Sequence, residues 1–160
     1  MLQLHAAADP AAGTTVNVGV LQGGTRSNVV AGSARAGVDV RVRSVQAQER
    51  IDQLLRGLTP RDPRVRVTVR GGWNRPVMEP SAAIASVYAL AHRAAERLGF
   101  ELRETSVGGA SDGNFAAAMG LPVLDGLGAV GGGAHARHEH VTVSGMVERS
   151  AVAAAVIAAF

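Results

Sequence analysis

The stretch ARAGVDVRVR at residues 34–43 decides what kind of fold this sequence can form. Small or β-branched residues alternate there with arginine, glycine and aspartate. Because successive side chains of a β-strand point to opposite faces, this alternation predicts a strand with one buried face and one face in water. The buried face would carry Ala34, Ala36, Val38, Val40 and Val42.

The neighbouring segments predict a strand, strand, helix, strand order. Residues 14–21 (TTVNVGVL) alternate in the same way and are interrupted by the turn-forming GGTRSN. Ser44 is a candidate N-cap for a helix through Leu58, whose apolar residues recur at helical spacing. Residues 64–70 (RVRVTVR) alternate once more and predict a third strand. We therefore expect an α+β unit in which a helix covers an antiparallel sheet.

A second unit is expected after GGWNRP at residues 71–76, where two glycines and a proline interrupt the pattern. Helices are predicted over residues 81–98, with Ser81 as the cap and Gly99 at the end, over 111–119, and from Ser144 to Phe160. Short strands are predicted at residues 101–105 and 122–127. Alternating helices and strands indicate part of an α/β layer, the edge of a larger sheet, because two parallel strands alone are hard to stabilise.

The composition narrows the class of protein. The 160 residues are 47% hydrophobic, enough for a sizeable core, and the net charge is +3. All 16 basic residues are arginines scattered along the chain and aromatic residues make up 3%, so we do not expect nucleic-acid binding. No apolar run reaches the roughly 20 residues of a membrane span, and the N-terminus has no secretory-signal pattern. We expect a cytoplasmic protein that does not enter a membrane.

The stretch GGGAHARHEHV at residues 131–141 is a candidate metal-binding segment. It holds three of the five histidines, and the absence of cysteine leaves His, Asp and Glu as metal ligands. His135 and Glu139 are four residues apart, and His138 and His140 are two apart, so one or two ligands are realistic. A catalytic zinc site usually takes three protein ligands, so this segment would need others. The alternative is a surface loop whose histidines hydrogen-bond to the backbone.

The stretch GGASDGN at residues 108–114 is a candidate anion site. Free backbone N–H groups at a helix N-terminus can hold a substrate carboxylate. The alternative is ordinary helix capping by Ser111 or Asp112. Taken alone, Asn28 in a glycine-rich turn and Arg41 on a polar strand face indicate only turn formation and solvation.

Four segments together resemble one family. In chain order they are TTVNVGVLQGGTRSNVV, AGVDVRVR, RPVMEPS and GGASDGNFAAAMGLPVLDGLGAVGGGAHARHEHV. They resemble the downstream half of the two-zinc aminoacylase and carboxypeptidase family, which includes acetylornithine deacetylase and succinyl-diaminopimelate desuccinylase. The glutamate carboxypeptidase branch is the most similar. The resemblance covers nearly the whole chain, and the linked Asn, D-x-R, G-G-x-S-D-G and H-x-x-x-E pattern is more specific than any single piece.

The resemblance implies two domains. Residues 1–77 would be a ferredoxin-like α+β lid domain that also serves dimerisation and is incomplete at its N-terminus. Residues 78–160 would be the C-terminal part of the zinc catalytic domain, a partial α/β segment. We therefore expect a homodimer formed through the lid.

The resemblance also implies roles for individual residues. His135 would be a zinc ligand, and Glu139 would have a supporting or structural role. Asn28 and Arg41 would reach from the lid to the carboxylate or carbonyl of the substrate, and the rigid fork of arginine suits a terminal carboxylate. The carboxylate pocket would be lined by Gly109, Ala110 and Ser111.

The chain lacks other parts of the family pattern. The H-x-D zinc ligands, the paired glutamates with the catalytic base, and the lid histidine in a G-x-x-x-H-A-G context have no counterpart here. We therefore expect a fragment of a two-zinc enzyme that cuts an amide bond in a peptide or an N-acyl amino acid, with glutamate as the leading candidate. The chain would hold no catalytic residue and would be inactive alone. The alternatives are a non-catalytic dimerisation or carboxylate-binding module, and a nonfunctional gene remnant.

Overall fold

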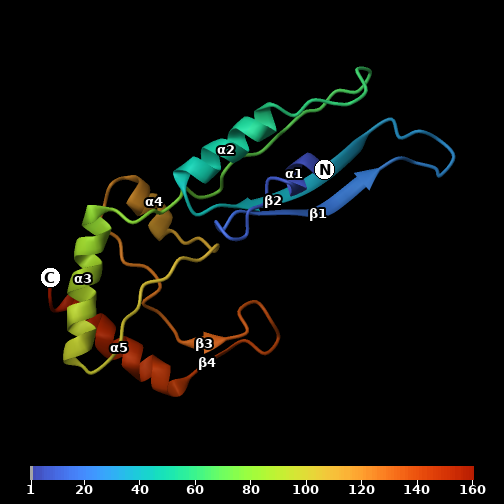
Figure 1. Ribbon diagram of the computed structural model, residues 1–160. Helices are drawn as coiled ribbons and strands as arrows, with labels where there is room; N and C mark the ends of the chain where they lie inside the picture. The colour runs from blue at the N-terminus through green and yellow to red at the C-terminus, as the bar shows by residue number, and fades with distance from the viewer. Residues whose placement is uncertain (1) are drawn as a thin grey trace. The chain divides into compact units, whose positions relative to one another are not determined.

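The structure is a computed structural model that describes residues 2–160 (Figure 1). The chain forms two compact units. The first runs to Glu79 and includes Ser106–Gly109, and the second comprises Pro80–Thr105 and Ala110–Phe160. Together they give an α+β fold with two small antiparallel sheets and five helices among the described residues.

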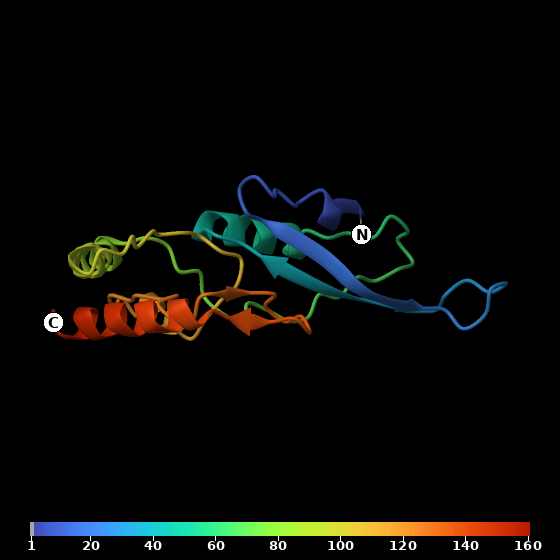
Figure 2. The same ribbon diagram turned by 90° about the horizontal axis from the view of Figure 1, so that it is seen from below.

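The first unit is built on a two-stranded hairpin. Strands β1 (Thr15–Gly23) and β2 (Ala34–Arg41) pair antiparallel, from Thr15 opposite Arg41 to Gly23 opposite Ala34. A register irregularity lies between Val18 and Val20. Helix α1 (Leu2–His5) precedes the hairpin, and α2 (Val45–Arg56) follows and runs along it (Figures 1 and 2). The two strands predicted around the alternating stretch are confirmed.

The hairpin has two faces near its open end, as the alternation predicts. Val16, Val18 and Val40 are half-buried there, whereas Thr15 and Arg41 on the other face are exposed. Towards the connecting loop the distinction is lost, because Leu21 is 66% exposed. The covered part of the sheet is therefore its open end.

Helix α2 begins and ends where local sequence chemistry places it. The Ser44 hydroxyl accepts a hydrogen bond from the Ala47 N–H at 3.1 Å, as expected of an N-cap. Ile51 is the most buried residue of the helix, at 2% exposure. The indole N–H of Trp73 donates to Asp52 at 2.9 Å, so the chain that follows the helix is tied back to it.

The strand predicted at residues 64–70 is wrong. Within residues 2–160 this segment has no β-ladder partner, and Val65, Val67 and Val69 are 54%, 44% and 50% exposed. A strand needs the N–H and C=O groups of a neighbouring strand, and alternation within the segment cannot supply them.

The second unit is built on two packed helices. Helices α3 (Ala82–Arg97) and α5 (Val143–Ile157) enclose a core of small and branched side chains, joined by α4 (Gly113–Ala118) and the short strands β3 (Gly131–Gly132) and β4 (His140–Val141). The core consists of Ala91, Ala94, Ala95, Leu102, Val152 and Val156. The Ser81 cap of α3 is confirmed, since its hydroxyl accepts from the Ile84 N–H at 3.2 Å, and Gly99 has the predicted left-handed conformation at φ 78°.

Two expectations for this unit are wrong. Residues 101–105 and 122–127 form no β-ladder within residues 2–160, although their apolar side chains pack on the helices: Leu102 is buried in the core, and Leu124 and Leu127 lie against it. The last helix is capped by Thr142 rather than opened by Ser144, since the Thr142 hydroxyl accepts from the Gly145 N–H at 3.2 Å. None of the helices in residues 2–160 has the length and apolar character that a membrane crossing demands.

Candidate functional site

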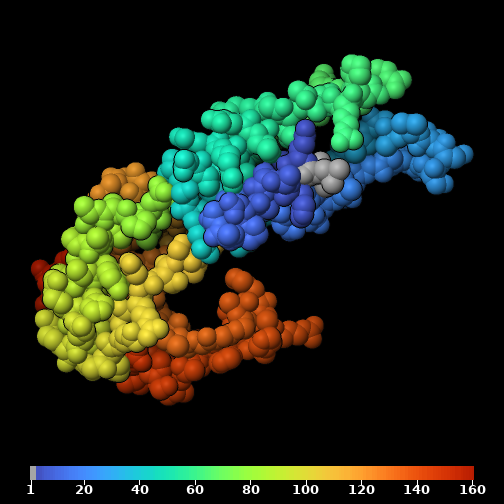
Figure 3. All heavy atoms as spheres, viewed as in Figure 1, coloured from blue at the N-terminus to red at the C-terminus, as the bar shows by residue number. Residues whose placement is uncertain are grey.

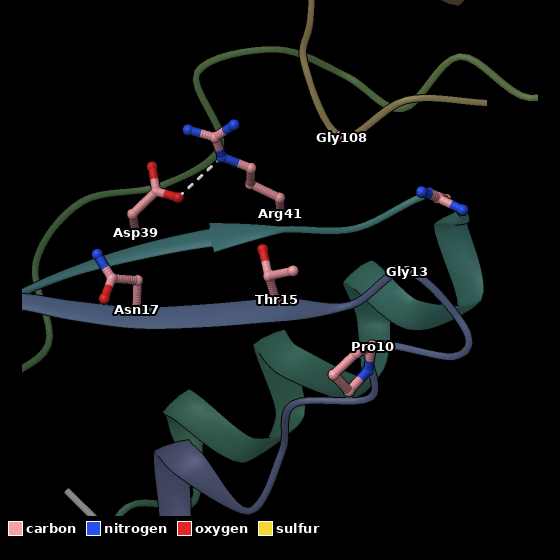
Figure 4. Close-up of a pocket in the computed structure, with 8 residues that line it drawn as sticks. Pro10, Gly13, Thr15, Asn17, Asp39, Arg41 and Gly108 are labelled. Atoms are coloured by element: carbon pink, nitrogen blue, oxygen red, sulfur yellow. Dashed lines mark hydrogen bonds and ion pairs between the residues drawn. The ribbon is translucent and has the colours of Figure 1, made fainter. Parts of the chain in front are cut away.

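A pocket of about 400 Å³ lies at the open end of the β1–β2 hairpin (Figure 4). We call it the strand pocket. It is lined by Pro10, Gly13, Thr15, Asn17, Asp39, Arg41, Arg43 and Gly108. Every lining residue belongs to the first unit.

The strand pairing brings the polar side chains of the pocket together. Thr15 is paired with Arg41 and Asn17 with Asp39, so four polar side chains share one face. Figure 4 shows Asp39 and Arg41 on the side of the hairpin away from α2. The valine face thus packs towards the helix and leaves the polar face for a ligand.

A tight turn before β1 forms one wall of the pocket. The backbone groups of Asp9 and Thr14 exchange hydrogen bonds at 2.9 and 2.8 Å, and the Asp9 carboxylate accepts from the Ala12 N–H at 3.1 Å. Gly13 adopts φ 73°, which glycine tolerates and most residues do not. This turn places Pro10 and Gly13 against the end of the hairpin.

Arg41 is held in the pocket by its neighbour on the same face. Its Nε lies 3.0 Å from Asp39 Oδ1, and both side chains are more than half exposed, at 56% and 58%. An exposed ion pair of this kind contributes little stability. The pair uses one of the five guanidinium N–H donors, so the other donors can bind a ligand oxygen.

The structure does not bring the two predicted lid residues to one point. Arg41 lies at the open end of the hairpin, whereas Asn28 lies exposed in the loop between β1 and β2. Seven residue steps of β2 separate Ala34 from Arg41, which is roughly 23 Å at about 3.3 Å per residue. One small ligand cannot contact both side chains of the same chain.

The glycine-rich stretch that follows residue 107 is divided. Gly108 lines the strand pocket, and Gly109 is exposed in the same unit, whereas Ala110 and Ser111 belong to the second unit. The Ser111 hydroxyl donates to Asp125 at 2.7 Å and accepts from the Gly113 N–H at 3.0 Å. The Ser111 hydroxyl therefore satisfies the first backbone N–H of α4, whose N-cap residue is Asp112, and the role of Ser111 in a carboxylate pocket stays a prediction.

The histidine-rich segment forms a narrow hairpin that we call the histidine turn, residues 131–141. Gly131 pairs with Val141 and Gly132 with His140. A Cβ at Gly131 would collide with the carbonyl of His140, and Gly133 has φ 71°. Gly131 and Gly133 are therefore explained by the structure of the turn, because the hairpin could not close with larger residues at these two positions.

The histidines of this turn are exposed, and the segment projects from the rest of its unit (Figure 3, orange). His140 Nδ1 lies 3.1 Å from the His138 carbonyl, a hydrogen bond to the backbone in the tautomer with the proton on Nδ1. His135 has φ 65°, a left-handed conformation that is uncommon for a residue with a side chain. Across residues 2–160 no three His, Cys, Asp or Glu side chains converge to hold a metal ion.

Among the described residues, His135 is therefore not joined by two further ligand side chains. A catalytic zinc takes three protein ligands, and the family resemblance assigns one ligand in this chain, His135. The role of His135 stays a prediction.

Several pocket residues were not predicted as site residues. Thr15, Asn17 and Asp39 share the polar face with Arg41, and Arg43 lines the pocket from just past the end of β2. For Asp39 the signal was the alternation itself, because residues two apart in a strand fall on the same side.

Comparison with known proteins identifies a family whose sequence profile spans nearly the whole chain. No curated protein matches it. The sequence profile of peptidase family M20/M25/M40 matches residues 2–159, which is nearly the entire chain, and confirms the family resemblance of its motifs. The chain therefore belongs to peptidase family M20/M25/M40, a family of metal-dependent peptidases and amidohydrolases.

Proposed function

We propose that this chain provides the lid and the end of the catalytic domain of a zinc-dependent amidohydrolase resembling the glutamate carboxypeptidases. The substrate would be a peptide or an N-acyl amino acid. The observation that carries the proposal is the strand pocket, in which Arg41 offers guanidinium donors to a carboxylate in a chain whose family profile spans residues 2–159.

The first unit would be the lid, a ferredoxin-like domain over residues 1–77. The order of an antiparallel hairpin followed by helix α2 supports this assignment. Residues 78–160 would complete the catalytic domain, with His135 as a zinc ligand.

The chain alone would bind a carboxylate and not hydrolyse the amide. Arg41 would hold the carboxylate through its free N–H donors while Asp39 fixes the direction of the side chain. Because the described residues bring no three ligands together, we assign no catalytic step to them.

The separation of Asn28 from Arg41 fits a homodimer formed through the lid. The strand between Arg41 and the loop that carries Asn28 is roughly 23 Å long, so the two side chains can both bind ligands only if each serves a different one. In a dimer, each ligand could meet Arg41 of one protomer and Asn28 of the other.

The test uses the 160-residue chain with added zinc and N-acetyl-glutamate. We expect binding in calorimetry, at least fivefold weaker affinity in Arg41→Gln, and no hydrolysis above that of His135→Ala. Arg35→Gln is the matched control, because Arg35 lies on the same face of β2, is hydrogen-bonded to Gln22 at 3.0 Å, and does not line the pocket. Hydrolysis that depends on His135, or no binding at all, would contradict the proposal.

A non-catalytic carboxylate-binding or dimerisation module is the second candidate, favoured by the lack of converging metal ligands among residues 2–160. Light scattering and zinc titration separate the two candidates. A stable dimer that binds the carboxylate with no zinc affinity at His135 would favour the module.

A further inference from the structure

Arg43 lies two residues beyond Arg41, just past the end of β2. The chain bends at Arg43, so this residue stands outside the strand ladder that ends at Arg41. Both arginines line the strand pocket. The family resemblance assigned a role to Arg41 and none to Arg43.

Gly13 determines where the Arg43 side chain runs. A Cβ at Gly13 would collide with Cδ and Nε of Arg43, so the arginine stem crosses directly over this glycine. The turn before β1 thus leaves space for Arg43 and directs it along the pocket wall.

The strand pocket has more positive than negative side chains. Arg41 is paired with Asp39 at 3.0 Å, whereas Arg43 has no ion-pair or hydrogen-bond partner within residues 2–160. With two arginines and one aspartate, the pocket has a net charge of about +1, and Arg43 carries the uncompensated charge. The hydroxyl of Thr15 and the amide of Asn17 are neutral partners for the rest of a ligand.

We propose that Arg43 is a second anion-binding residue of the strand pocket, and that with it the pocket holds a ligand through one carboxylate. The inference rests on the proposed function only in taking the ligand to be a carboxylate. Without Arg43 the charged groups of the pocket would be the neutral Arg41–Asp39 pair, so the attraction of the pocket for an anion would be weaker.

The experiment is a calorimetric titration of the 160-residue chain without zinc. The probes are N-acetylglycine, its neutral amide and N-acetyl-glutamate. We expect the amide not to bind, and the two acids to bind within about threefold of each other. Arg43→Gln should weaken both acids about tenfold, the loss of one charge-assisted hydrogen bond at an exposed site. Asp39→Asn should tighten both.

Controls separate binding from folding. Arg43→Lys should keep part of the affinity because it keeps the charge, and Arg35→Gln should leave affinity unchanged. The fluorescence of Trp73, which lies in the same unit, checks that each variant is folded.

The outcomes distinguish the two proposals. Unchanged affinity in a folded Arg43→Gln, with loss in Arg41→Gln, would overturn the role of Arg43 and leave the proposed function standing. A tenfold preference for N-acetyl-glutamate would overturn the single-carboxylate assignment. Failure of the unaltered chain to bind either acid would reject both proposals.

Discussion

Strand β2 and residues 64–70 both alternate small or branched apolar residues with other residues, mostly arginine, but only β2 forms a strand. In β2 the backbone is paired with β1 and Val40 is half-buried. In residues 64–70 the backbone has no ladder within the described chain, and the three valines are about half exposed. Alternation in the sequence therefore determines which side chains share a face. Whether the backbone is paired and that face is covered depends on a neighbouring strand or helix.

Turn chemistry and helix contacts explain the difference. β2 is joined to β1 by a loop that returns the chain directly alongside, which makes pairing local. Residues 64–70 follow a helix, so their pairing depends on a distant strand. The bond from Trp73 to Asp52 ties the chain just after this segment back to α2, whereas the Asp62–Arg64 ion pair at its start is local.

The largest expected effect is from loss of the buried side chain of α2. Ile51→Ala should lower the free energy of unfolding by about 2–5 kcal/mol, because it leaves a cavity at a 2% exposed site. Val67→Ala in the unpaired segment should change it by less than about 0.5 kcal/mol. Urea unfolding followed by Trp73 fluorescence measures both. Equal losses would mean that residues 64–70 are covered in solution.

Hydrogen exchange compares the two segments without mutation. Amides in the β1–β2 ladder should exchange at least tenfold more slowly than those of residues 65–70, which have no ladder partner in the described chain. Exchange measured by NMR or mass spectrometry tests this. Similar protection in both would show that residues 64–70 pair with another strand.

Asp52→Ala should have a smaller effect, about 1 kcal/mol, because it removes the acceptor of one part-buried hydrogen bond. Trp73 is the single tryptophan, so its emission should shift to the red as the indole becomes solvated. Gln53→Ala, an exposed neighbour on α2, is the matched control. An unchanged spectrum in Asp52→Ala would show that this bond does not hold the segment.

The smallest effect is the pH dependence of the turn before residue 64. The side-chain hydrogen bond from Arg64, and then its backbone N–H, lower the pKa of Asp62 below its ordinary value. A lowered carboxyl pKa adds stability above the ordinary value, and that contribution is lost as the pH falls through the lowered pKa. The Arg64 amide resonance should follow this titration and become insensitive to it in Asp62→Asn. A midpoint above the ordinary value of Asp would contradict the ion pair.

The sequence was most informative where structure depends on local chemistry. Ser44 and Ser81 cap the helices as predicted, and Gly99 takes its left-handed conformation, because these features depend on residues within one turn. The strands predicted at 101–105 and 122–127 have no β-ladder within residues 2–160, although Leu102 is buried in the helix core and Leu124 lies against it.

For the candidate site, the sequence indicated Arg41 and part of the pocket wall. It could not show that Arg43 crosses Gly13 or that Ser111 is bonded to Asp125, because those contacts join residues far apart in the chain. His135 stays a prediction.

The four residues Ser106–Gly109 belong to the first unit although the chain on both sides belongs to the second. A gene shortened after Glu79 would therefore encode the hairpin and its helix while omitting Gly108 from the pocket wall. If the two units are expressed separately, the first unit will lack one wall residue of the strand pocket. Residues Ser106–Gly109 should therefore be joined to the first unit before its ligand affinity is measured.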